Sequence, residues 1–487
     1  MPAGTELLAG MNPVLGWRYS GAMGEQNSVP KRIVACPVSC PRWRTSVSGR
    51  YNGGLYFVRV IVSQLGVAVL LLAVATSSAG QSASLFRPNE IIVKFDPNVA
   101  GIQSVRIAEA YGCRVAGTCP AGNLRLIHVP EAVDPNLMAE AFAQRGDVEY
   151  AEPNPIATIL YVPDDNYYSF QWNLHNSATG GIHMEDAWDL GRGDPNVIVA
   201  ILDTGVAYED YGVYRQAPDL ADTRFVPGYD FAKDDAHPND DQGHGTHVAG
   251  TVAQSTNNGM GVAGIAYGCS IMPVKVLDAD GIGDHFTIAR GIRFAVERGA
   301  RVINLSLGSP KASITLRDAV AFAHQRGVTV VCAAGNSYQS GNPANYPATY
   351  DEHVVAVGAV RYDNRRARYS NTGSYLDVVA PGGDMFVDQN GDGYGDGIVQ
   401  QTFVGDPTDF AYYFFQGTSM AAPHVSGLAA LLISHGVTEP DEVRAVLQET
   451  SVDLGPVGWD PEYGWGRIDA GAALLRASLI EIDADSE

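Results

Sequence analysis

The run from Val197 to Leu202 is apolar at every position and rich in β-branched residues. A strand of this composition is buried on both faces, as happens in a parallel sheet covered by helices. Arg301 to Leu305 and Val328 to Ala334 also have the pattern of strands. Because strand and helix patterns alternate from Val197 to Leu432, the sequence predicts an α/β fold. Its sheet should be mostly parallel, with helices on both faces.

A carboxylate stands at the end of the first of these strands, in the sequence Asp203-Thr204-Gly205. Open α/β sheets build their binding and catalytic sites at the carboxyl ends of strands. Asp203 is therefore a candidate site residue, and the alternative is an ordinary turn aspartate.

A serine surrounded by small residues lies near the other end of the chain, in the stretch from Gly417 to Gly427. An apolar run, Leu428 to Ile433, follows it, so Ser419 is expected at the start of a helix. There the helix dipole and free N–H groups stabilise developing negative charge. A serine nucleophile also needs a base and an acid that orients the base. The alternative is that Ser419 only caps the helix.

A histidine between two glycines supplies the candidate base. His244 lies in Gly243-His244-Gly245-Thr246-His247, and a helical pattern follows. Two histidines at i and i+3 with no glutamate between them do not form the metalloprotease pattern. We therefore expect His244 to be the base and His247 to be a packed or hydrogen-bonded helix residue.

Aspartate, histidine and serine follow one another here in the chain order of subtilisins. Asp203-Thr204-Gly205, His244 to His247 and Gly417 to His424 also match the three motifs of that family intact. From about Tyr161 to about Leu475 the chain resembles the subtilisin-like serine proteases, or subtilases. The resemblance implies that Asp203, His244 and Ser419 form a triad. It also implies hydrolysis of protein or peptide substrates through an acyl-enzyme.

The resemblance further implies an oxyanion hole and a substrate groove. Asn336 follows the strand of residues 328–334 and matches the family's oxyanion-hole asparagine, with the N–H of Ser419 as its partner. An amide donor aimed at the carbonyl oxygen lowers the barrier to acyl transfer. Substrate would pair as an added strand beside the segment after residue 305. The implied groove and pocket residues are Ser306, Leu307, Gly308, Ala334, Gly335 and Asn345. With Asn345 at the pocket floor, we expect a preference for medium-sized apolar side chains.

The first 79 residues differ in charge from the rest of the chain. They hold seven basic and two acidic residues, so without them the formal net charge falls from −22 to −27. So acidic a body argues against nucleic acid and anionic membranes as partners. Arg59, the apolar run Leu65 to Ala75, and small Ser77 and Ala79 follow the order of a secretory signal. We expect a leader over 1–79, a secreted protein (extracellular or periplasmic), and no stable membrane insertion after cleavage. The alternative is a single membrane anchor.

Residues 80–160 have the pattern of a small separate domain. Strands are expected at 90–95, 113–116, 124–129 and 148–151, with helices at 102–111 and 136–144. The order β-α-β-β-α-β is that of an α+β ferredoxin-like fold. It resembles subtilase propeptides, which assist folding and inhibit the enzyme until they are cut away. The chain's own propeptide is thus an expected partner, and a permanent accessory domain is the alternative. Cys113 and Cys119 are close enough in sequence to pair across a turn, although no disulfide is established.

The peptidase domain is expected over residues 161–480. It should end in a helix over 470–479, followed by an acidic tail, 481–487. The leading interpretation is a secreted, calcium-stabilised serine endopeptidase made as a self-inhibited, self-processed precursor. One alternative is a catalytically silent, calcium-dependent binding protein, which the intact triad argues against. Another is a carboxyl-type peptidase with glutamate in place of the histidine, which His244 argues against.

A calcium loop is predicted between Asp388 and Gly397. Oxygen side chains stand at positions 1, 3, 5 and 9, with glycine at position 6, as in EF-hand loops. Val399 replaces the usual glutamate, so a complete EF-hand is not expected, and a solvated turn is the alternative. The predicted ligands are Asp388, Asn390, Asp392 and Asp396. Resemblance to the thermitase branch implies a second structural Ca2+ site at Asp165, Asp219 and Asn258.

Overall fold

The computed structural model describes residues 86–131, 133–156, 161–175 and 179–484. The predicted leader over 1–79 lies outside these residues, as do 157–160 and the last three residues of the predicted tail. Within the described residues, none of the helices is both long enough and apolar enough to span a bilayer.

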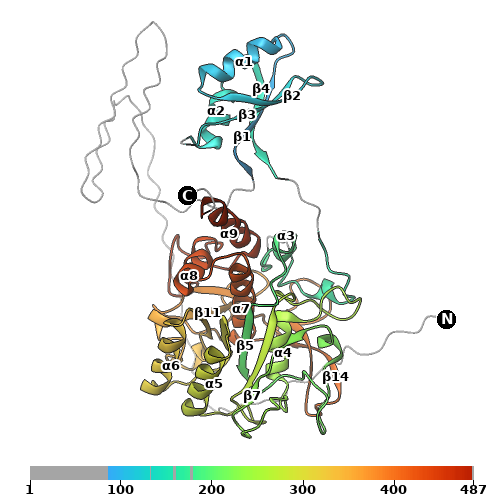
Figure 1. Ribbon diagram of the computed structural model, residues 1–487, viewed down its shortest axis with the longest axis vertical. Helices are drawn as coiled ribbons and strands as arrows, with labels where there is room; N and C mark the ends of the chain where they lie inside the picture. Colours follow the sequence, from blue (N-terminus) through green and yellow to red (C-terminus); the bar gives the residue numbers. More distant parts are fainter. Residues whose placement is uncertain (1–85, 132, 157–160, 176–178, 485–487) are drawn as a thin grey trace, which may run out of the picture. The chain divides into compact units, whose positions relative to one another are not determined.

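The N-terminal unit has the element order expected from the sequence (Figure 1). Its four strands form an antiparallel sheet in the order β2-β3-β1-β4. Alternate residues of β1, namely Ile91, Val93 and Phe95, are fully buried in a core shared with both helices. The elements are β1 (Phe86–Phe95), α1 (Gly101–Ala110), β2 (Arg114–Cys119), β3 (Leu124–His128), α2 (Pro135–Ala143) and β4 (Val148–Pro155).

Cys113 and Cys119, whose pairing the sequence left open, do not form a disulfide. Both thiols are free, and the two residues lie at opposite ends of β2 rather than across a turn. An extended strand advances about 3.3 Å per residue, so their Cα atoms are far beyond the ~7 Å limit for a disulfide.

The described chain from residue 161 onward is built on an eight-stranded sheet whose pairings are all parallel. The strand order is β12-β11-β10-β9-β5-β8-β6, with β7 also paired to β8. The strands are β5 (Ile198–Asp203), β6 (Arg224–Phe225), β7 (Tyr229–Asp230), β8 (Ser270–Lys275), β9 (Val302–Leu305), β10 (Thr329–Ala333), β11 (Val355–Val360) and β12 (Val378–Pro381).

Helices cover both faces of this sheet, as the apolar strands predicted (Figure 1). On β5, Val199 and Ile201 pack into one core with α4 and α7, whereas Ala200 and Leu202 pack into a second core with α5 and α6. The predicted fold class is therefore confirmed. The helices are α3 (Met184–Leu190), α4 (His244–Ala253), α5 (His285–Glu297), α6 (Ile314–His324), α7 (Thr418–Ser434), α8 (Pro440–Glu449) and α9 (Ala470–Ala484), with short 3₁₀ turns η1 (Tyr168–Phe170), η2 (Pro218–Leu220), η3 (Tyr338–Ser340) and η4 (Asp351–His353).

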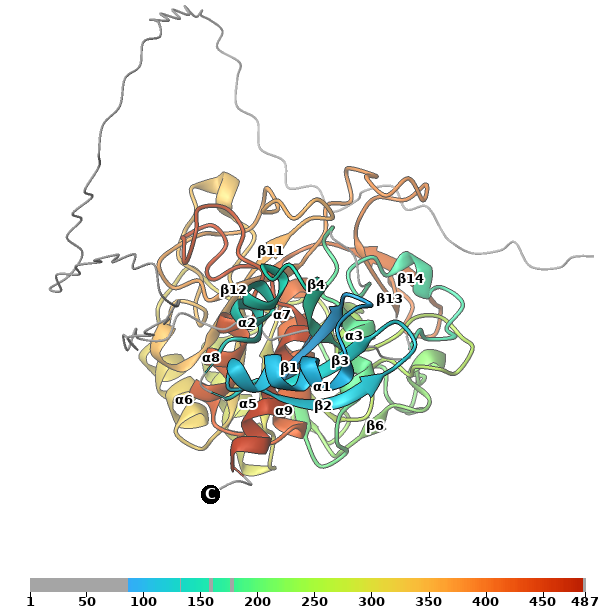
Figure 2. The same ribbon diagram turned by 90° about the horizontal axis from the view of Figure 1, so that it is seen from above.

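Two features differ from, or add to, the sequence prediction. Helix α9 runs on to Ala484, into the segment predicted as an acidic tail, because Glu481 and Ala484 are good helix formers and extend its last turn. An antiparallel hairpin of β13 (Ile398–Phe403) and β14 (Phe410–Phe415) precedes α7 (Figure 2).

Candidate active site

The carboxylate of Asp203 is held at the end of a central strand. Its side chain is fully buried, because β5 lies between β8 and β9. Oδ1 accepts hydrogen bonds from the N–H of Thr204 at 2.8 Å and from His244 Nδ1 at 2.7 Å. The order of the strands therefore fixes the position of the Asp203 carboxylate, and this carboxylate orients the ring of His244.

His244 is the first residue of α4, which approaches the loop after β5 very closely. An added Cβ at Gly245 would lie 2.1 Å from the carbonyl oxygen of Gly205, so only glycine permits this contact. The His244 side chain remains 25% exposed, enough for its ring to be reached from outside. Burial lowers the pKa of His244, but the charge and hydrogen bond of Asp203, together with the charge of Asp240, raise it more, and the net shift is upward from 6.5.

His247, on the same helix, has a different environment. Its Nε2 donates to the carbonyl oxygens of Ile398 and Tyr413, and its ring stacks on Phe415. Burial lowers the pKa of His247 to about 3, so it stays neutral. The prediction that His247 is a packed helix residue is confirmed.

Ser419 lies in the first turn of α7 and is joined to the segment after β9 by two hydrogen bonds. Its Oγ donates to the carbonyl oxygen of Ser306 at 3.1 Å, and Ser306 Oγ donates to the carbonyl oxygen of Ser419 at 2.8 Å. The start of α7 is thus locked against the edge of the sheet. In this conformation the Ser419 hydroxyl uses Ser306, rather than His244, as its acceptor.

Two N–H donors border a small space beside Gly417. Asn336 Oδ1 accepts from both the N–H and the hydroxyl of Thr418 at 2.9 Å. A main-chain N–H can only donate, so this contact assigns the amide oxygen and turns Nδ2 away from Thr418. An added Cβ at Gly417 would lie 3.3 Å from Asn336 Nδ2 and 3.6 Å from the nitrogen of Ser419. The missing side chain of Gly417 therefore leaves room between two donors.

The predicted groove residues follow β9 and β10, as their positions in the sequence indicated. Asn345 connects the two segments: its Nδ2 donates to the carbonyl oxygen of Ala333 at 2.9 Å. An added Cβ at Gly308 would lie 2.2 Å from Asn345 Nδ2, and one at Gly335 would lie 3.0 Å from Asn345 Cβ. Gly308 and Gly335 thus both lie against the half-buried side chain of Asn345.

Two similarities to known proteins bear on this arrangement. Residues 194–466 match the family model described as subtilase. A thermophilic serine proteinase from Bacillus sp. strain AK1 is 37% identical over 380 residues, which cover 77% of this chain and 85% of the relative. The chain belongs to the subtilase family.

Further similarities narrow this assignment. Thermitase from Thermoactinomyces vulgaris is 37% identical over 315 residues, 64% of this chain and 99% of thermitase. A protease structure from Pseudoalteromonas arctica has 36% identity and a TM-score of 0.57, and covers 65% of this chain and 100% of its own. Residues 73–154 match the fervidolysin N-terminal prodomain. The chain is therefore a thermitase-like subtilase and a serine endopeptidase, with an N-terminal propeptide region.

In the predicted calcium loop of this subtilase, the negative charges of neighbouring carboxylates repel one another. Asp396 is 1% exposed; its Oδ2 accepts from the N–H of Gln389, whereas its Oδ1 meets no donor among the described residues. Burial raises the pKa of Asp396, and the carboxylates of Asp388 and Asp392 add to the shift, against opposing main-chain hydrogen bonds. An orphaned buried oxygen among like charges fits a cation.

At the second predicted site, two of the three residues, Asp165 and Asp219, are likewise buried carboxylates that lie close to one another. Asp165 Oδ1 is buried and meets no donor in the part of the chain that the structure describes. Burial raises the pKa of Asp219 to about 7 and Asp165 adds to this, although hydrogen bonds from Asn258, Val262 and Tyr412 oppose it. Asn258 differs from the prediction in orientation. Its Oδ1 accepts from the N–H of Met260, so it turns Nδ2, not oxygen, toward Asp219.

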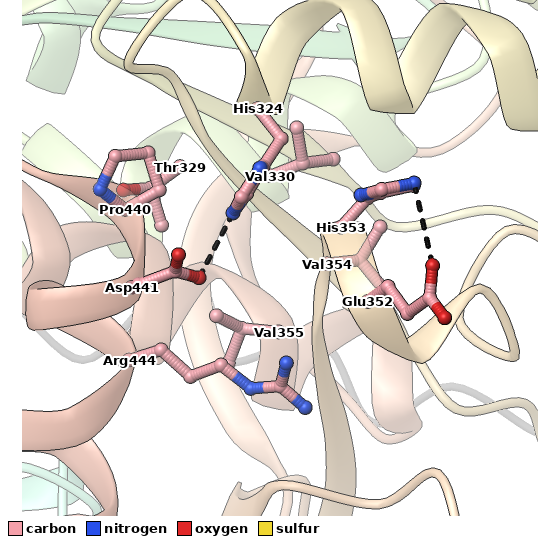
Figure 3. A pocket seen from close by; sticks show the side chains of 10 residues that line it. All are labelled: His324, Thr329, Val330, Glu352, His353, Val354, Val355, Pro440, Asp441 and Arg444. Atoms are coloured by element: carbon pink, nitrogen blue, oxygen red, sulfur yellow. Dashed lines mark hydrogen bonds and ion pairs between the residues drawn. The ribbon is translucent and has the colours of Figure 1, made fainter.

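Side chains of His, Cys, Asp and Glu do not gather in threes as metal ligands anywhere in residues 86–131, 133–156, 161–175 or 179–484. Either calcium site would thus need amide or main-chain oxygens to complete it. A separate surface pocket holds two histidines between α6, η4 and α8 (Figure 3). There His324 Nε2 lies 3.0 Å from Asp441 Oδ1, and His353 Nε2 lies 4.0 Å from Glu352 Oε2. This pocket shares no residue with the site around Ser419.

Sequence reasoning missed the contacts that hold the site together. Gly417, Thr418 and the hydroxyl of Ser306 act through contacts between distant segments, which a linear pattern does not reveal. Asp240 was also missed, because it lies four residues before His244 and outside the N-cap position of α4, which is Gly243.

Proposed function

We propose that this subtilase is a secreted enzyme that hydrolyses protein and peptide substrates through Asp203, His244 and Ser419. The observation that carries the proposal is the 2.7 Å hydrogen bond between His244 Nδ1 and Asp203 Oδ1. An ionised carboxylate can only accept, so Nδ1 carries the proton and Nε2 keeps its lone pair. A ring held in this tautomer is equipped to act as a general base.

In the proposed reaction, Ser419 Oγ exchanges its bond to Ser306 for one to His244 and attacks the substrate carbonyl carbon. A C–O bond forms, His244 Nε2 takes the serine proton, and the carbonyl oxygen becomes an oxyanion. The imidazolium then gives its proton to the leaving amine as the C–N bond breaks. Water repeats the sequence on the acyl-enzyme and releases the acid.

The space beside Gly417 is the proposed oxyanion hole. Asn336 Nδ2 and the N–H of Ser419 border it from two directions, and the bonds from Thr418 pre-orient the amide. Donors fixed in advance need no reorganisation when charge develops. Substrate would pair with the segment Ser306 to Gly308, with its side chain between that segment and Ala334-Gly335, above Asn345.

The propeptide and leader complete the proposal. Residues 80–160 would be removed from the peptidase domain, 161–480, by the enzyme's own site. The fervidolysin-type prodomain match supports an inhibitory N-terminal unit of this kind. The charge and small-residue pattern of residues 1–79 supports export of the precursor.

Calcium is proposed as a structural ion only. Asp388, Asn390, Asp392 and Asp396 would hold one ion. Asp165 and Asp219 would hold a second, with Asn258 if its amide turns. When bound, a cation neutralises carboxylates that otherwise repel one another. None of these residues contacts Asp203, His244 or Ser419 through a described hydrogen bond.

Casein hydrolysis by the purified enzyme is expected to rise with pH across the ionisation of His244, because only the neutral ring accepts the serine proton. Since the pKa of His244 is raised from 6.5, the acid limb of kcat/KM should have its midpoint above that value. The measurement is kcat/KM against pH at constant ionic strength. Activity that peaks in acid and vanishes at about pH 8 would contradict the proposal.

Chelation of calcium is expected to lower the thermal unfolding midpoint of an enzyme whose active site is blocked. An ion that binds only the folded state stabilises it by about 2.7 kcal/mol at a hundredfold excess over Kd. Asp392→Ala should reduce the chelator-induced shift, because it removes a ligand from the loop. Asp406→Ala, an exposed turn aspartate of the β13–β14 hairpin, is the matched control and should keep the full shift. A midpoint unmoved by chelation would contradict the calcium proposal.

A further inference from the structure

Asp240 is a buried carboxylate that the proposed reaction does not use. It is 1% exposed and lies four residues before His244, between the loop after β5 and the start of α4. Its two oxygens accept five hydrogen bonds. The donors are Thr204 Oγ1, Gln242 N and Gly243 N at Oδ1, and Thr246 N and Thr246 Oγ1 at Oδ2.

These donors come from both sides of the acid–base pair. Thr204 follows Asp203 directly and bonds Asp240 at 2.9 Å. Thr246 lies two residues after His244 and donates to Asp240 from its N–H at 2.9 Å and from its hydroxyl at 2.6 Å. One carboxylate thus connects the residue next to the acid with the helix turn that carries the base.

Each threonine hydroxyl closes a second connection between the same two segments. Thr204 Oγ1 accepts from the N–H of Gly245 at 2.9 Å, and Thr246 Oγ1 accepts from the N–H of Ala207 at 3.0 Å. A hydroxyl has one proton to donate, so both hydroxyls direct theirs to Asp240. The network therefore requires an ionised Asp240 that accepts on both oxygens.

The charges near His244 are few and each has a defined partner. Asp203 and Asp240 are the two carboxylates that act on the ring. On the neighbouring segments, Lys275 and Lys233 both pair with Asp241, and His247 is neutral. Asp241 is therefore paired with two lysines. Asp240 instead accepts hydrogen bonds at the N-terminus of α4, where the helix dipole stabilises a negative charge.

We infer that Asp240 is a positioning residue that holds His244 in register with Asp203. The inference rests on the proposed function, because it gives His244 the role of base. A base displaced by about 1 Å can lose roughly 100-fold in rate, which is the scale on which such a crosslink matters.

Asp240→Asn tests this. Asparagine keeps the shape but has one acceptor oxygen, so its NH2 must face the donors of Thr204 and Gly243 or those of Thr246. On a peptide substrate we expect kcat to fall about 10- to 100-fold with KM unchanged. The acid limb of kcat/KM should also move to lower pH, because a negative charge that favours the imidazolium is gone.

Asp230→Asn is the matched control. Asp230 is as deeply buried and accepts the N–H groups of Ala232 and Lys233 at 2.8 Å, but it does not contact α4 through a described hydrogen bond. This variant should keep kcat and the acid limb, whatever stability it loses. An Asp240→Asn enzyme with the same thermal unfolding midpoint as Asp230→Asn, and with wild-type kcat and acid limb, would overturn the inference.

If Asp240→Asn does not fold, Thr204→Val tests the positioning role of Asp240 instead. It removes only the hydroxyl that joins Asp240 to Gly245, and we expect kcat to fall several-fold at constant KM; an unchanged kcat would overturn the inference. Failure of the proposed function looks different. It would leave Ser419→Ala active, whereas failure of this inference alone leaves Ser419→Ala inactive and the Asp240 and Thr204 variants unaffected.

Discussion

Ser419→Ala is expected to abolish peptide hydrolysis, with a loss of about 10⁶-fold in kcat, the scale measured when the nucleophile of a subtilisin is removed. The variant keeps the N–H of residue 419, Asn336 and the groove, so it should still bind substrate. What it lacks is the atom that forms the covalent bond. The measurement is kcat and KM on a peptide amide, with binding of a peptide inhibitor as the test of an intact groove.

The same variant should also leave the precursor uncut, because one nucleophile serves both reactions. Gel electrophoresis and N-terminal sequencing of the protein, expressed without other proteases, would show the propeptide still attached. Ser434→Ala, at the other end of α7, is the matched control; its hydroxyl bonds the carbonyl oxygen of Ala430, and it should mature normally. Maturation of Ser419→Ala under these conditions would show that Ser419 is not the nucleophile.

The site residues come from positions that the topology of the sheet brings together. Asp203 ends β5, Ser306 follows β9 and Asn336 follows β10, and these are three neighbouring parallel strands. Their carboxyl ends share one edge, against which α4 and α7 begin with His244 and with Thr418 and Ser419. Segments more than two hundred residues apart in the chain, such as those of Asp203 and Ser419, therefore meet at this edge.

The parts that could be predicted from the sequence are those in which local pattern and fold agree. The apolar positions of β5 have to be buried on both faces, and Asp203 has to follow them at the edge of the sheet. The propeptide elements could also be ordered from their periodicity alone. In each case the physical requirement lies within a few consecutive residues.

Other features of the fold and the site could not be predicted, because they depend on contacts between residues that the sequence does not reveal. Spacing alone suggested that Cys113 and Cys119 could pair, but the segment between them is extended rather than turned. Resemblance to the thermitase branch implied that Asn258 is a calcium ligand, but it did not reveal that the amide oxygen accepts from the N–H of Met260. Asp240 carries no motif of its own, and only its hydrogen bonds to Thr204 and Thr246 distinguish it from other buried aspartates.

Asn336→Ala is expected to lower kcat by about 10²- to 10³-fold, the cost of removing one oxyanion-hole donor in a subtilisin. Because Nδ2 borders the space beside Gly417, where the oxyanion is proposed to form, KM should stay near its wild-type value. A donor that strengthens only in the transition state changes kcat and kcat/KM equally.

Thr418→Val distinguishes the role of the Asn336 amide donor from that of the hydroxyl that orients this amide. It removes the hydroxyl that bonds Asn336 Oδ1 but keeps the Thr418 N–H and the amide itself, so kcat should fall much less than in Asn336→Ala. Steady-state kcat and KM for both variants on one peptide amide make the comparison. If Asn336→Ala raised KM and left kcat intact, the amide would bind the ground state, and the oxyanion hole would have to be formed by other donors.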